Sequence, residues 1–533
     1  MCQVRCLKWM NLPPGMGYNL SVSRIGVLVG ETRPLSALMV SKLAPRVGQY
    51  VFVRYNERGQ DHRFLALVQR VWRANPFLEE GLTDPEHALR IMELEQWDSF
   101  FKAELTIVGQ VEGGRLSFPK SPPLPGAEVS EADEEGLREV LGAEDEARWA
   151  KIGTLLGSDA PVYVDVDQLV LRHLAVLAVT GGGKSNAVGV ILEEMVKRGG
   201  TAIVMDPHGE YGSMGHEITP VINPLMLSVD EIAGLLGVDM ETSSIQYYLL
   251  SEARRQLENE LRRGNLREGD EFDRAVISGM DFFQALSAKV ESLTEAEQQG
   301  LMRGISRKQD SFAGLLIRID NLRNTMGELF NPSAKPLVER IEQGNLNAVN
   351  LSGLDQDAAE VVVSHLLRHI LRERKNAAAG RESCLPKPVF VVLEEAHLFC
   401  PDRQSTRTKA IASRIAREGR KFGLGLCLVS QRPKRLDPDV LSQMNNMIVL
   451  RIVEPADQRH IAEASENLSG DFLQYLPSLN PGEAVCTGPA FRVPLLVKIA
   501  EAKNKPAGRD ISVTEVWKEQ GKMSLDDARE IYG

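Results

Sequence analysis

AVTGGGKS, residues Ala178 to Ser185, is the stretch on which the fold assignment depends. Its three glycines, Gly181, Gly182 and Gly183, allow backbone N–H groups to converge on an anion, because a Cβ would clash or the required φ is positive. Lys184 is placed to contact the β- and γ-phosphates of ATP, and the Ser185 hydroxyl to ligate Mg²⁺. The stretch predicts a phosphate-binding loop in which alanine replaces the usual first glycine.

The sequence on both sides of this loop fits a strand and a helix. An apolar run precedes it, SNAVGVILEEMVKRG follows with helical spacing, and TAIVMD is a further apolar run. Strand, helix and strand in succession are typical of a parallel α/β sheet, and the helix N-terminus would face the phosphates. A glycine-rich turn beside a chance Lys-Ser pair is the alternative, which this context disfavours. The residues expected to contact ATP here are Thr180, Gly181, Gly182, Gly183, Lys184, Ser185 and Asn186.

Two adjacent carboxylates follow another apolar run, in PVFVVLEEAH. Parallel strands of an open α/β sheet present their carboxyl ends at the edge where ligands bind. We assign Glu394 to the shell of Mg²⁺ and Glu395 to the attacking water, which it would orient and deprotonate. A solvated strand end is the alternative interpretation of the pair.

Further polar residues come after two other predicted strands. DPHGEY contributes Asp206 and Glu210, which would add carboxylates near the γ-phosphate. Gln431, in LVSQRP, fits a polar sensor of that phosphate. A Pro-Gly turn with solvated charges explains DPHGEY equally well.

The chain divides by its patterns into five parts. Residues 24–127 carry short runs rich in Val, Ile and Phe that are broken by Gly, Pro and Asn, which predicts a small β-barrel. Residues 152–498 have the pattern of a RecA-like α/β ATPase domain, with a helical insertion at about 227–334. An N-terminal extension (1–23), an acidic linker helix (128–151) and a C-terminal tail (499–533) complete the division.

The composition fits a cytoplasmic globular protein. The net charge of -11 argues against a protein that coats nucleic acid, although a ring with a locally basic channel stays compatible with it. The six cysteines are scattered without a CxxC pair, so we expect reduced thiols. No apolar run approaches the roughly 20 residues that cross a bilayer, so no membrane contact is expected.

Five strings in order resemble the HerA/FtsK superfamily of ring translocases: AVTGGGKSNAV, DPHGEY, VVLEEAH, IAREGRKFG and VSQRP. The β-rich part, followed by IGTLLGSDAPVYVDVDQLVLRHLAVLAVTGGGKS, is similar to HerA in particular. The resemblance as a whole covers roughly Arg24 to Lys498. The resemblance implies a homohexamer that hydrolyses ATP between subunits while double-stranded DNA passes through its channel. It also implies a separate partner, either a NurA-like nuclease or a sirtuin-like defence effector.

The resemblance also implies arginines near the nucleotide. A ring motor needs a cation delivered across the subunit interface to the γ-phosphate. Arg420 in IAREGRKFG is the first choice and Arg417 the second, while Arg172 matches a family arginine placed near the nucleotide. A surface face of salt bridges is the alternative for these arginines.

Two basic loops are candidates for contact with DNA phosphates. One is 402–409, with Arg403, Arg407 and Lys409, and the other is Arg303 to Lys308. Solvated basic loops without any DNA contact are the alternative.

The function that the resemblance implies is an ATP-driven DNA translocase in DNA end processing or antiviral defence. The alternative is a ring scaffold that recruits an effector and uses ATP as a conformational switch. A membrane-tethered DNA pump is disfavoured, because no membrane segment is expected.

Overall fold

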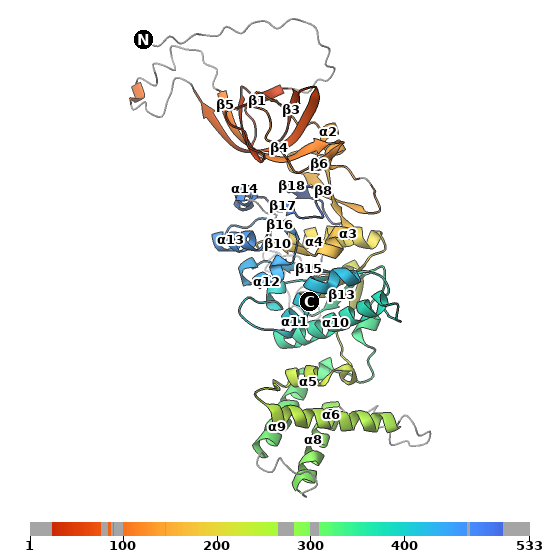
Figure 1. Cartoon of the computed structure of the whole chain (residues 1–533). Helices are drawn as coiled ribbons and strands as arrows, with labels where there is room; N and C mark the ends of the chain where they lie inside the picture. Colours follow the sequence, from red (N-terminus) through yellow and green to blue (C-terminus); the bar gives the residue numbers. More distant parts are fainter. Residues whose placement is uncertain are drawn as a thin grey trace, which may run out of the picture. The chain divides into compact units, whose positions relative to one another are not determined.

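The structure, a computed structural model, describes residues 24–75, 84–86, 89, 100–143, 145–264, 282–298, 309–465 and 470–504. Its contacts separate two compact units (Figure 1). The first is Met1–Gly142 with Gly157–Ala160, and the second is Ala143–Leu156 with Pro161–Gly533. Each unit has its own sheet.

The first unit contains a closed barrel of six antiparallel strands. Pairing of the last long strand with the second strand closes the ring, which removes unpaired strand edges. A short strand, β6 (Arg115–Ser117), pairs with the outside of this ring at β5. The predicted β-barrel is therefore confirmed. Around the ring the strands are β2 (Ser36–Ser41), β1 (Arg24–Val29), β7 (Glu128–Glu131), β3 (Tyr50–Glu57), β4 (Gln60–Ala74) and β5 (Phe100–Glu112).

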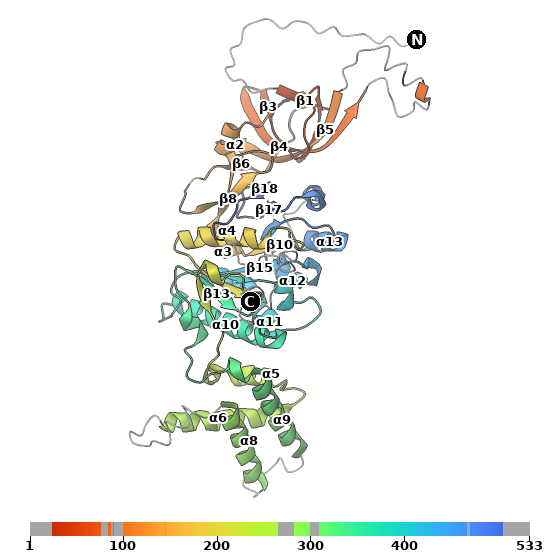
Figure 2. The same cartoon turned by 180° about the vertical axis from the view of Figure 1, so that it is seen from behind.

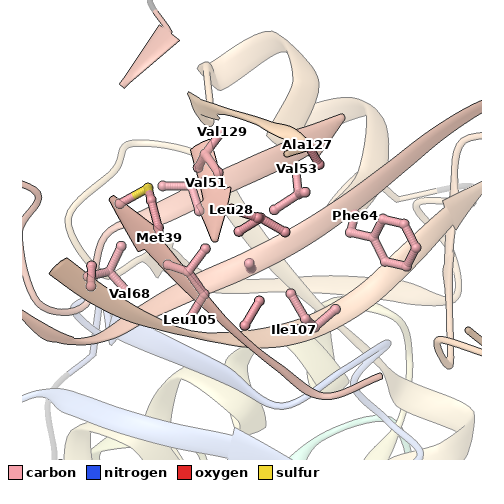
Figure 3. Close-up of a cluster of buried hydrophobic side chains, with 13 residues drawn as sticks. Leu28, Met39, Val51, Val53, Phe64, Val68, Leu105, Ile107, Ala127 and Val129 are labelled. Carbon is pink, nitrogen blue, oxygen red and sulfur yellow. The ribbon is translucent and has the colours of Figure 1, made fainter. Parts of the chain in front are cut away.

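Aliphatic side chains and one phenyl ring fill the barrel (Figure 3). Side chains alternate between the two faces of a strand, and β2 accordingly alternates between partly exposed and buried residues. β3 and β4 have consecutive buried residues instead, which fits the short runs rich in Val, Ile and Phe that predict the unit. The labelled core residues are Leu28, Met39, Val51, Val53, Phe64, Val68, Leu105, Ile107, Ala127 and Val129.

The linker differs from the helix expected over 128–151. Its first residues form β7, which pairs with both β1 and β3 and so completes the barrel. The helix α2 is shorter, Glu134–Leu141, and begins at Asp133, whose side chain accepts from the backbone N–H of Gly136. β8 (Trp149–Leu155) follows within the expected helix. Pairing on two sides outweighs the weak strand preference of the acidic sequence around β7.

The second unit is built on one mixed sheet of eleven strands. Seven strands in the order β12, β13, β11, β14, β15, β10 and β16 are parallel, and four antiparallel strands, β17, β18, β8 and β9, extend the sheet beyond β16. Every residue of β10, β11, β14, β15 and β16 is buried, which explains their continuous apolar runs. The RecA-like α/β fold is confirmed. The strands are β8 (Trp149–Leu155), β9 (Pro161–Asp165), β10 (Leu174–Leu177), β11 (Thr201–Asp206), β12 (His216–Ile218), β13 (Leu346–Asn350), β14 (Val389–Leu393), β15 (Leu424–Ser430), β16 (Asn446–Val449), β17 (Glu483–Thr487) and β18 (Leu495–Ile499).

Helices pack on this sheet and connect its strands. α4 contacts β10 and β11, α11 contacts β15, and α10 contacts α11. Because β10, β11, β14 and β15 are parallel, the loops that follow them leave the same edge of the sheet, called here the carboxyl edge. The opposite side is called the amino edge. The helices are α3 (Val166–Arg172), α4 (Lys184–Lys197), α10 (Gln356–Ala378), α11 (Arg407–Glu418), α12 (Pro438–Ser442), α13 (Pro455–Ala464) and α14 (Gly470–Leu473).

The helical insertion lies between β12 and β13, as expected. It contains α5 (Val229–Leu235), α6 (Ser244–Gly264), α8 (Phe282–Gln298) and α9 (Gln309–Met326). Both views show α6, α8 and α9 packed together (Figures 1 and 2). A side-chain bond joins α6 to α9, because Gln246 donates to the carbonyl of Ser311 at 3.2 Å.

Four cysteines fall within the described residues, and all four are free thiols. Cys400, Cys427 and Cys486 are buried, and burial raises the pKa of each thiol. The N-terminal extension, its two cysteines and the tail beyond residue 504 lie outside the described residues. Among the helices the structure describes, none has the length and apolarity needed to span a bilayer.

Candidate nucleotide-hydrolysis site

The phosphate-binding loop joins β10 to α4 at the carboxyl edge. Gly181 and Gly183 have φ values of 74° and 95°, a left-handed backbone that side chains other than glycine rarely adopt. A Cβ on Gly183 would also lie 3.0 Å from the backbone nitrogen of Gly482. The helix α4 begins at Lys184, directly after this turn, so its free N–H groups point into the loop. Gly181 and Gly183 are therefore required by the backbone that the loop adopts.

Lys184 meets the carboxylate pair of the β14 end. Its Nζ lies 2.6 Å from Oε1 of Glu395 and 3.5 Å from Oε2 of Glu394. Burial by itself would lower the pKa of Lys184, but the two carboxylates outweigh burial and raise it. The lysine and both acids, more than 200 residues apart in sequence, therefore form one charged cluster.

Glu395 is held in one orientation by three side chains. Besides the contact with Lys184, its Oε1 accepts from Nε2 of Gln431 at 2.8 Å, and its Oε2 lies 3.2 Å from Nδ1 of His397. The backbone of Glu395 has a φ of 46°, a strained conformation that is concentrated at functional sites. Burial would raise the pKa of Glu395, but His397 and Lys184 together lower it to about 2. Glu395 is therefore an ionised, fixed carboxylate.

Glu394 has a different environment. Its Oε1 accepts a short hydrogen bond from the hydroxyl of Tyr211, and both side chains are buried. Burial raises the pKa of Glu394, against the opposing effects of Lys184 and Tyr211. Tyr211 lies in DPHGEY, where its backbone N–H donates to Asp206 at 2.8 Å. DPHGEY thus contributes a tyrosine to the site, which sequence reasoning missed.

Two further side chains join the loop to this cluster. The hydroxyl of Thr180 donates to Oε1 of Gln431 at 2.6 Å, and Gln431 in turn donates to Glu395. The hydroxyl of Ser185 donates to Oε2 of Glu210 at 3.2 Å. The loop, DPHGEY, the β14 acids and the β15 glutamine therefore converge at one place, as the sequence predicts. His397, also missed from sequence, stood beside the predicted acids in LEEAH.

Comparison with known proteins identifies the family. A family model described as "Helicase HerA, central domain" matches residues 150–370. The DNA double-strand break repair helicase HerA of Sulfolobus acidocaldarius is 36% identical over 500 residues, which cover 93% of this chain and 96% of that protein. The chain belongs to the HerA helicase family. It is accordingly a P-loop ATPase, and the resemblance drawn from its motifs is confirmed.

A second HerA relative and one solved structure also match most of the chain. The DNA double-strand break repair helicase HerA of Pyrococcus furiosus is 32% identical over 462 residues, covering 78% of this chain and 82% of that protein. Among solved structures, VirB4 of Thermoanaerobacter pseudethanolicus has a TM-score of 0.48 at 16% identity, over 67% of this chain and 97% of that chain.

Two residues predicted to bind the nucleotide have hydrogen bonds within the protein. Both ends of the Asn186 amide hold the segment after β18: Nδ2 donates to the carbonyl of Ala500 at 2.8 Å, and Oδ1 accepts from the N–H of Ala502 at 2.9 Å. Asp206 accepts from the N–H groups of His208 and Tyr211, and so orders the turn of DPHGEY. In this HerA chain, Asn186 and Asp206 thus order the backbone around the site, and their contact with the nucleotide stays a prediction.

The three predicted arginines lie away from the site of their own chain. Arg172 ends α3, directly before β10, whereas the phosphate-binding loop follows β10 at its other end. Arg417 lies in the last turn of α11 and Arg420 in the 3-10 turn η6 (Gly419–Phe422), which precedes β15. All three are therefore at the amino edge. Arg417 and Arg420 are exposed, and within the described part of the chain neither has an ion-pair partner.

Two of the basic side chains predicted to contact DNA phosphates have partners within the protein. Lys409 pairs with Asp437 at 2.5 Å and donates to the carbonyls of Pro401, Asp402 and Gln404. Arg407 donates to the carbonyl of Gly234 and lies 3.7 Å from Glu360. Both cations therefore stabilise loop backbone within this chain. The Arg403 side chain is 95% exposed, and Arg303 to Lys308 lie outside the described residues.

Because two histidines are buried in the second unit, we expect its free energy of unfolding to fall at acidic pH. Burial lowers the pKa of His173 to about 4 and that of His369 to about 3, against 6.5 in an unfolded chain. Between those values the unfolded chain binds more protons, so stability falls as pH falls below 6.5. At pH 5.5 each histidine should cost about 1 kcal/mol relative to pH 7.5. Urea titrations at the two pH values measure this, and equal free energies of unfolding would contradict it.

Proposed function

We propose that this HerA-family chain hydrolyses ATP to drive movement along double-stranded DNA. The observation that carries the proposal is the cluster in which Lys184 lies 2.6 Å from Glu395 and 3.5 Å from Glu394. A phosphate-binding lysine beside two carboxylates is the arrangement that phosphoryl transfer to water requires. The relatives from Sulfolobus acidocaldarius and Pyrococcus furiosus, both named as DNA double-strand break repair helicases, support DNA as the track.

The hydrolysis step follows from the contacts of Glu395. When a triphosphate enters the loop, its oxygens compete for Lys184, which then exchanges its contact with Glu395 for the phosphates. Without that positive charge beside it, the pKa of Glu395 rises and the carboxylate becomes a better base. Gln431 and His397 keep its orientation, so Glu395 can accept a proton from water aligned with the γ-phosphate. ATP binding itself thus prepares the base.

The residues around Ser185 fit Mg²⁺. The Ser185 hydroxyl and the carboxylate of Glu210 lie 3.2 Å apart, and the Glu394 charge acts on the same region. Hydroxyl and carboxylate oxygens are the hard ligands that Mg²⁺ prefers. We assign Ser185 and Glu394 to the ion, with Glu210 as an additional ligand or partner of its water shell. When bound, Mg²⁺ neutralises charge that develops on the phosphate oxygens.

The amino-edge arginines are proposed to act on a neighbouring subunit. Within one chain they stand across the sheet from the phosphate-binding loop, so their own nucleotide is out of reach. A closed ring, for which a homohexamer is our proposal, would bring Arg420 or Arg417 of one subunit to the γ-phosphate of the next. Arg172 would lie beside them.

The pathway is proposed from the family resemblance. A separate nuclease of NurA type would cut the DNA that this motor moves in end processing, or a sirtuin-like effector would act with it in antiviral defence. ATP hydrolysis measured with and without a double-stranded DNA fragment tests the motor. We expect DNA to accelerate hydrolysis several-fold, and a rate that ignores DNA with and without a partner would contradict the proposal.

Arg403 is expected to contact DNA, whereas Lys409 is expected to stabilise its loop. Arg403→Ala should weaken DNA binding and reduce the slope of log affinity against log salt by about 1, as one lost phosphate contact does. Lys409→Met should instead lower the free energy of unfolding, because Asp437 loses its partner. Fluorescence anisotropy with labelled duplex at several salt concentrations measures the first effect. Arg381→Ala, an exposed arginine beyond α10, is the matched control.

A further inference from the structure

Arg374 is a buried guanidinium that binds the turn carrying Arg420. It lies on α10 and is 5% exposed. Its Nε and Nη2 donate to the carbonyl of Phe422 at 2.9 and 2.6 Å, and Nη1 donates to the carbonyl of Leu385 at 2.7 Å. Within the described part of the chain it has no ion-pair partner, and burial lowers its pKa. Its hydrogen bonds therefore go to backbone carbonyls.

Burying a guanidinium costs free energy, so we ask what Arg374 does that an apolar side chain could not do. A buried charge without a carboxylate loses hydration that carbonyl contacts replace only in part. The carbonyls at the end of a helical turn are its negative pole and lack partners within the turn. Phe422 is the last residue of η6, so Arg374 satisfies its carbonyl and fixes where the turn ends. Gly423 follows with a φ of 61°, which lets the chain enter β15.

His173 holds the same region from the other side. Its Nδ1 accepts from the backbone N–H of Leu426 at 3.0 Å. Because that N–H can only donate, the ring proton of this neutral histidine is on Nε2, which donates to the carbonyl of Ala416 at 3.0 Å. One imidazole thus ties the last turn of α11 to β15. His173 does so from a left-handed backbone with a φ of 62°, which is rare outside glycine.

A third contact comes from the residue beside Arg374. Lys375 pairs with Glu418 at 2.7 Å, and its Nζ lies 5.0 Å from the centre of the Phe422 ring. Arg417 and Arg420 project from this held segment and are themselves exposed. The backbone beneath the two arginines is therefore fixed from α10, from the end of α3 and from β15.

We propose that Arg374 and His173 are positioning residues that set the segment bearing Arg417 and Arg420 for contact with the nucleotide of a neighbouring subunit. The inference rests on the proposed function, since it requires those arginines to act across an interface. Stabilisation of a developing charge depends strongly on donor placement, and an error near 1 Å costs on the order of a hundredfold in rate. A long exposed arginine meets that demand only if its backbone does not move.

The first test separates the turnover number from nucleotide affinity. Arg374→Met should lower kcat at saturating ATP about tenfold or more, because the trans cation is misplaced. The KM for ATP should stay within about threefold, because the phosphate-binding loop of each subunit is intact. Arg374→Lys should give an intermediate kcat, because an ammonium can donate to one carbonyl but lacks the planar set of N–H donors with which a guanidinium binds two carbonyls. His173→Asn, which tolerates the left-handed backbone but is too short to bridge both partners, should resemble Arg374→Met.

The ATPase activity of mixed subunits provides a second test. A role of Arg374 in folding alone would not restore activity in such a mixture. Glu395→Gln subunits bind ATP but lack the catalytic base, and their arginine edge is intact, whereas Arg374→Met subunits have an intact base and a displaced arginine edge. In a 1:1 mixture about one quarter of the interfaces combine an intact base with an intact edge, if assembly is random. The mixture should then reach up to about a quarter of wild-type activity, above the mean of the two variants measured alone. No recovery would overturn the inference, because it would mean that Arg374 serves its own subunit or its fold.

A second mixture distinguishes an error in the positioning role of Arg374 from an error in the proposed trans role of the arginines. Arg420→Ala mixed with Glu395→Gln tests the trans arginine directly. Recovery in that mixture without recovery for Arg374→Met overturns only the positioning role. Absence of recovery in both mixtures, repeated with Arg417→Ala, overturns the trans arginines themselves. Arg381→Met, an exposed arginine just beyond the same helix, is the matched control and should leave kcat unchanged.

Discussion

A Glu395→Gln variant is expected to bind ATP normally and to hydrolyse it on the order of 10²- to 10⁴-fold more slowly. The amide keeps the size of the side chain and can still contact Gln431 and His397. It cannot accept a proton from water, and it no longer offers Lys184 a negative partner 2.6 Å away. Loss of that partner leaves Lys184 freer for phosphates, so ATP affinity should be unchanged or higher.

Single-turnover hydrolysis and binding of a fluorescent ATP analogue measure the two effects separately. Glu394→Gln is the informative comparison, because Glu394 is assigned to Mg²⁺ and contacts Tyr211. It should raise the Mg²⁺ concentration needed for half-maximal activity, whereas Glu395→Gln should not. If the Glu395 variant keeps a substantial rate while the Glu394 variant loses all of it, the two roles are reversed.

The same variant separates a motor from an ATP-switched scaffold. A motor that cannot hydrolyse ATP stops moving on DNA and loses its cellular function. A scaffold that needs only bound ATP keeps both its assembly and its effector activity. Duplex translocation and effector activity measured on Glu395→Gln would therefore decide between these two hypotheses.

Much of the site was predictable because its residues follow strands. Parallel strands bring the ends of distant sequence segments together, so AVTGGGKS and LEEAH could be placed side by side without coordinates. Gln431 was found for the same reason, since β15 lies between β10 and β14. The barrel was predictable from its short runs of Val, Ile and Phe, which Gly, Pro and Asn interrupt.

Other features depend on contacts that no local pattern reveals. Asn186 follows the phosphate-binding loop directly, yet its amide is used by a segment more than 300 residues away. Lys409 and Arg407 have the composition of a DNA-binding loop, but both also contact backbone carbonyls and a carboxylate of their own chain, Asp437 and Glu360 respectively. Strand β7 is acidic and short, and only its pairing with β1 and β3 makes it a strand. Tertiary partners, which the sequence does not display, decided each case.

Lys184→Ala is expected to abolish ATP binding and, unusually for a loop residue, to destabilise the fold. Its side chain is 14% exposed and is the cation between two acids that are each about 5% exposed. Removing one partner of a buried ion pair costs about 3–5 kcal/mol, because the remaining charge stays unpaired. Urea unfolding and nucleotide binding of the purified variant measure both losses.

The cause of that destabilisation can be tested by its pH dependence and by a second substitution. Without Lys184 the pKa of Glu395, now about 2, should rise toward its usual value, because burial is then opposed by His397 without the help of Lys184. A carboxyl group with a lowered folded pKa stabilises the fold above its unfolded pKa and loses that contribution as pH falls. The stability deficit of Lys184→Ala should therefore be full at pH 7 and shrink as pH falls below about 4.5. The double variant Lys184→Ala with Glu395→Gln should regain most of the lost stability at pH 7 and none of the activity. A deficit that is independent of pH and unrelieved by Glu395→Gln would show that Lys184 and Glu395 are not energetically coupled.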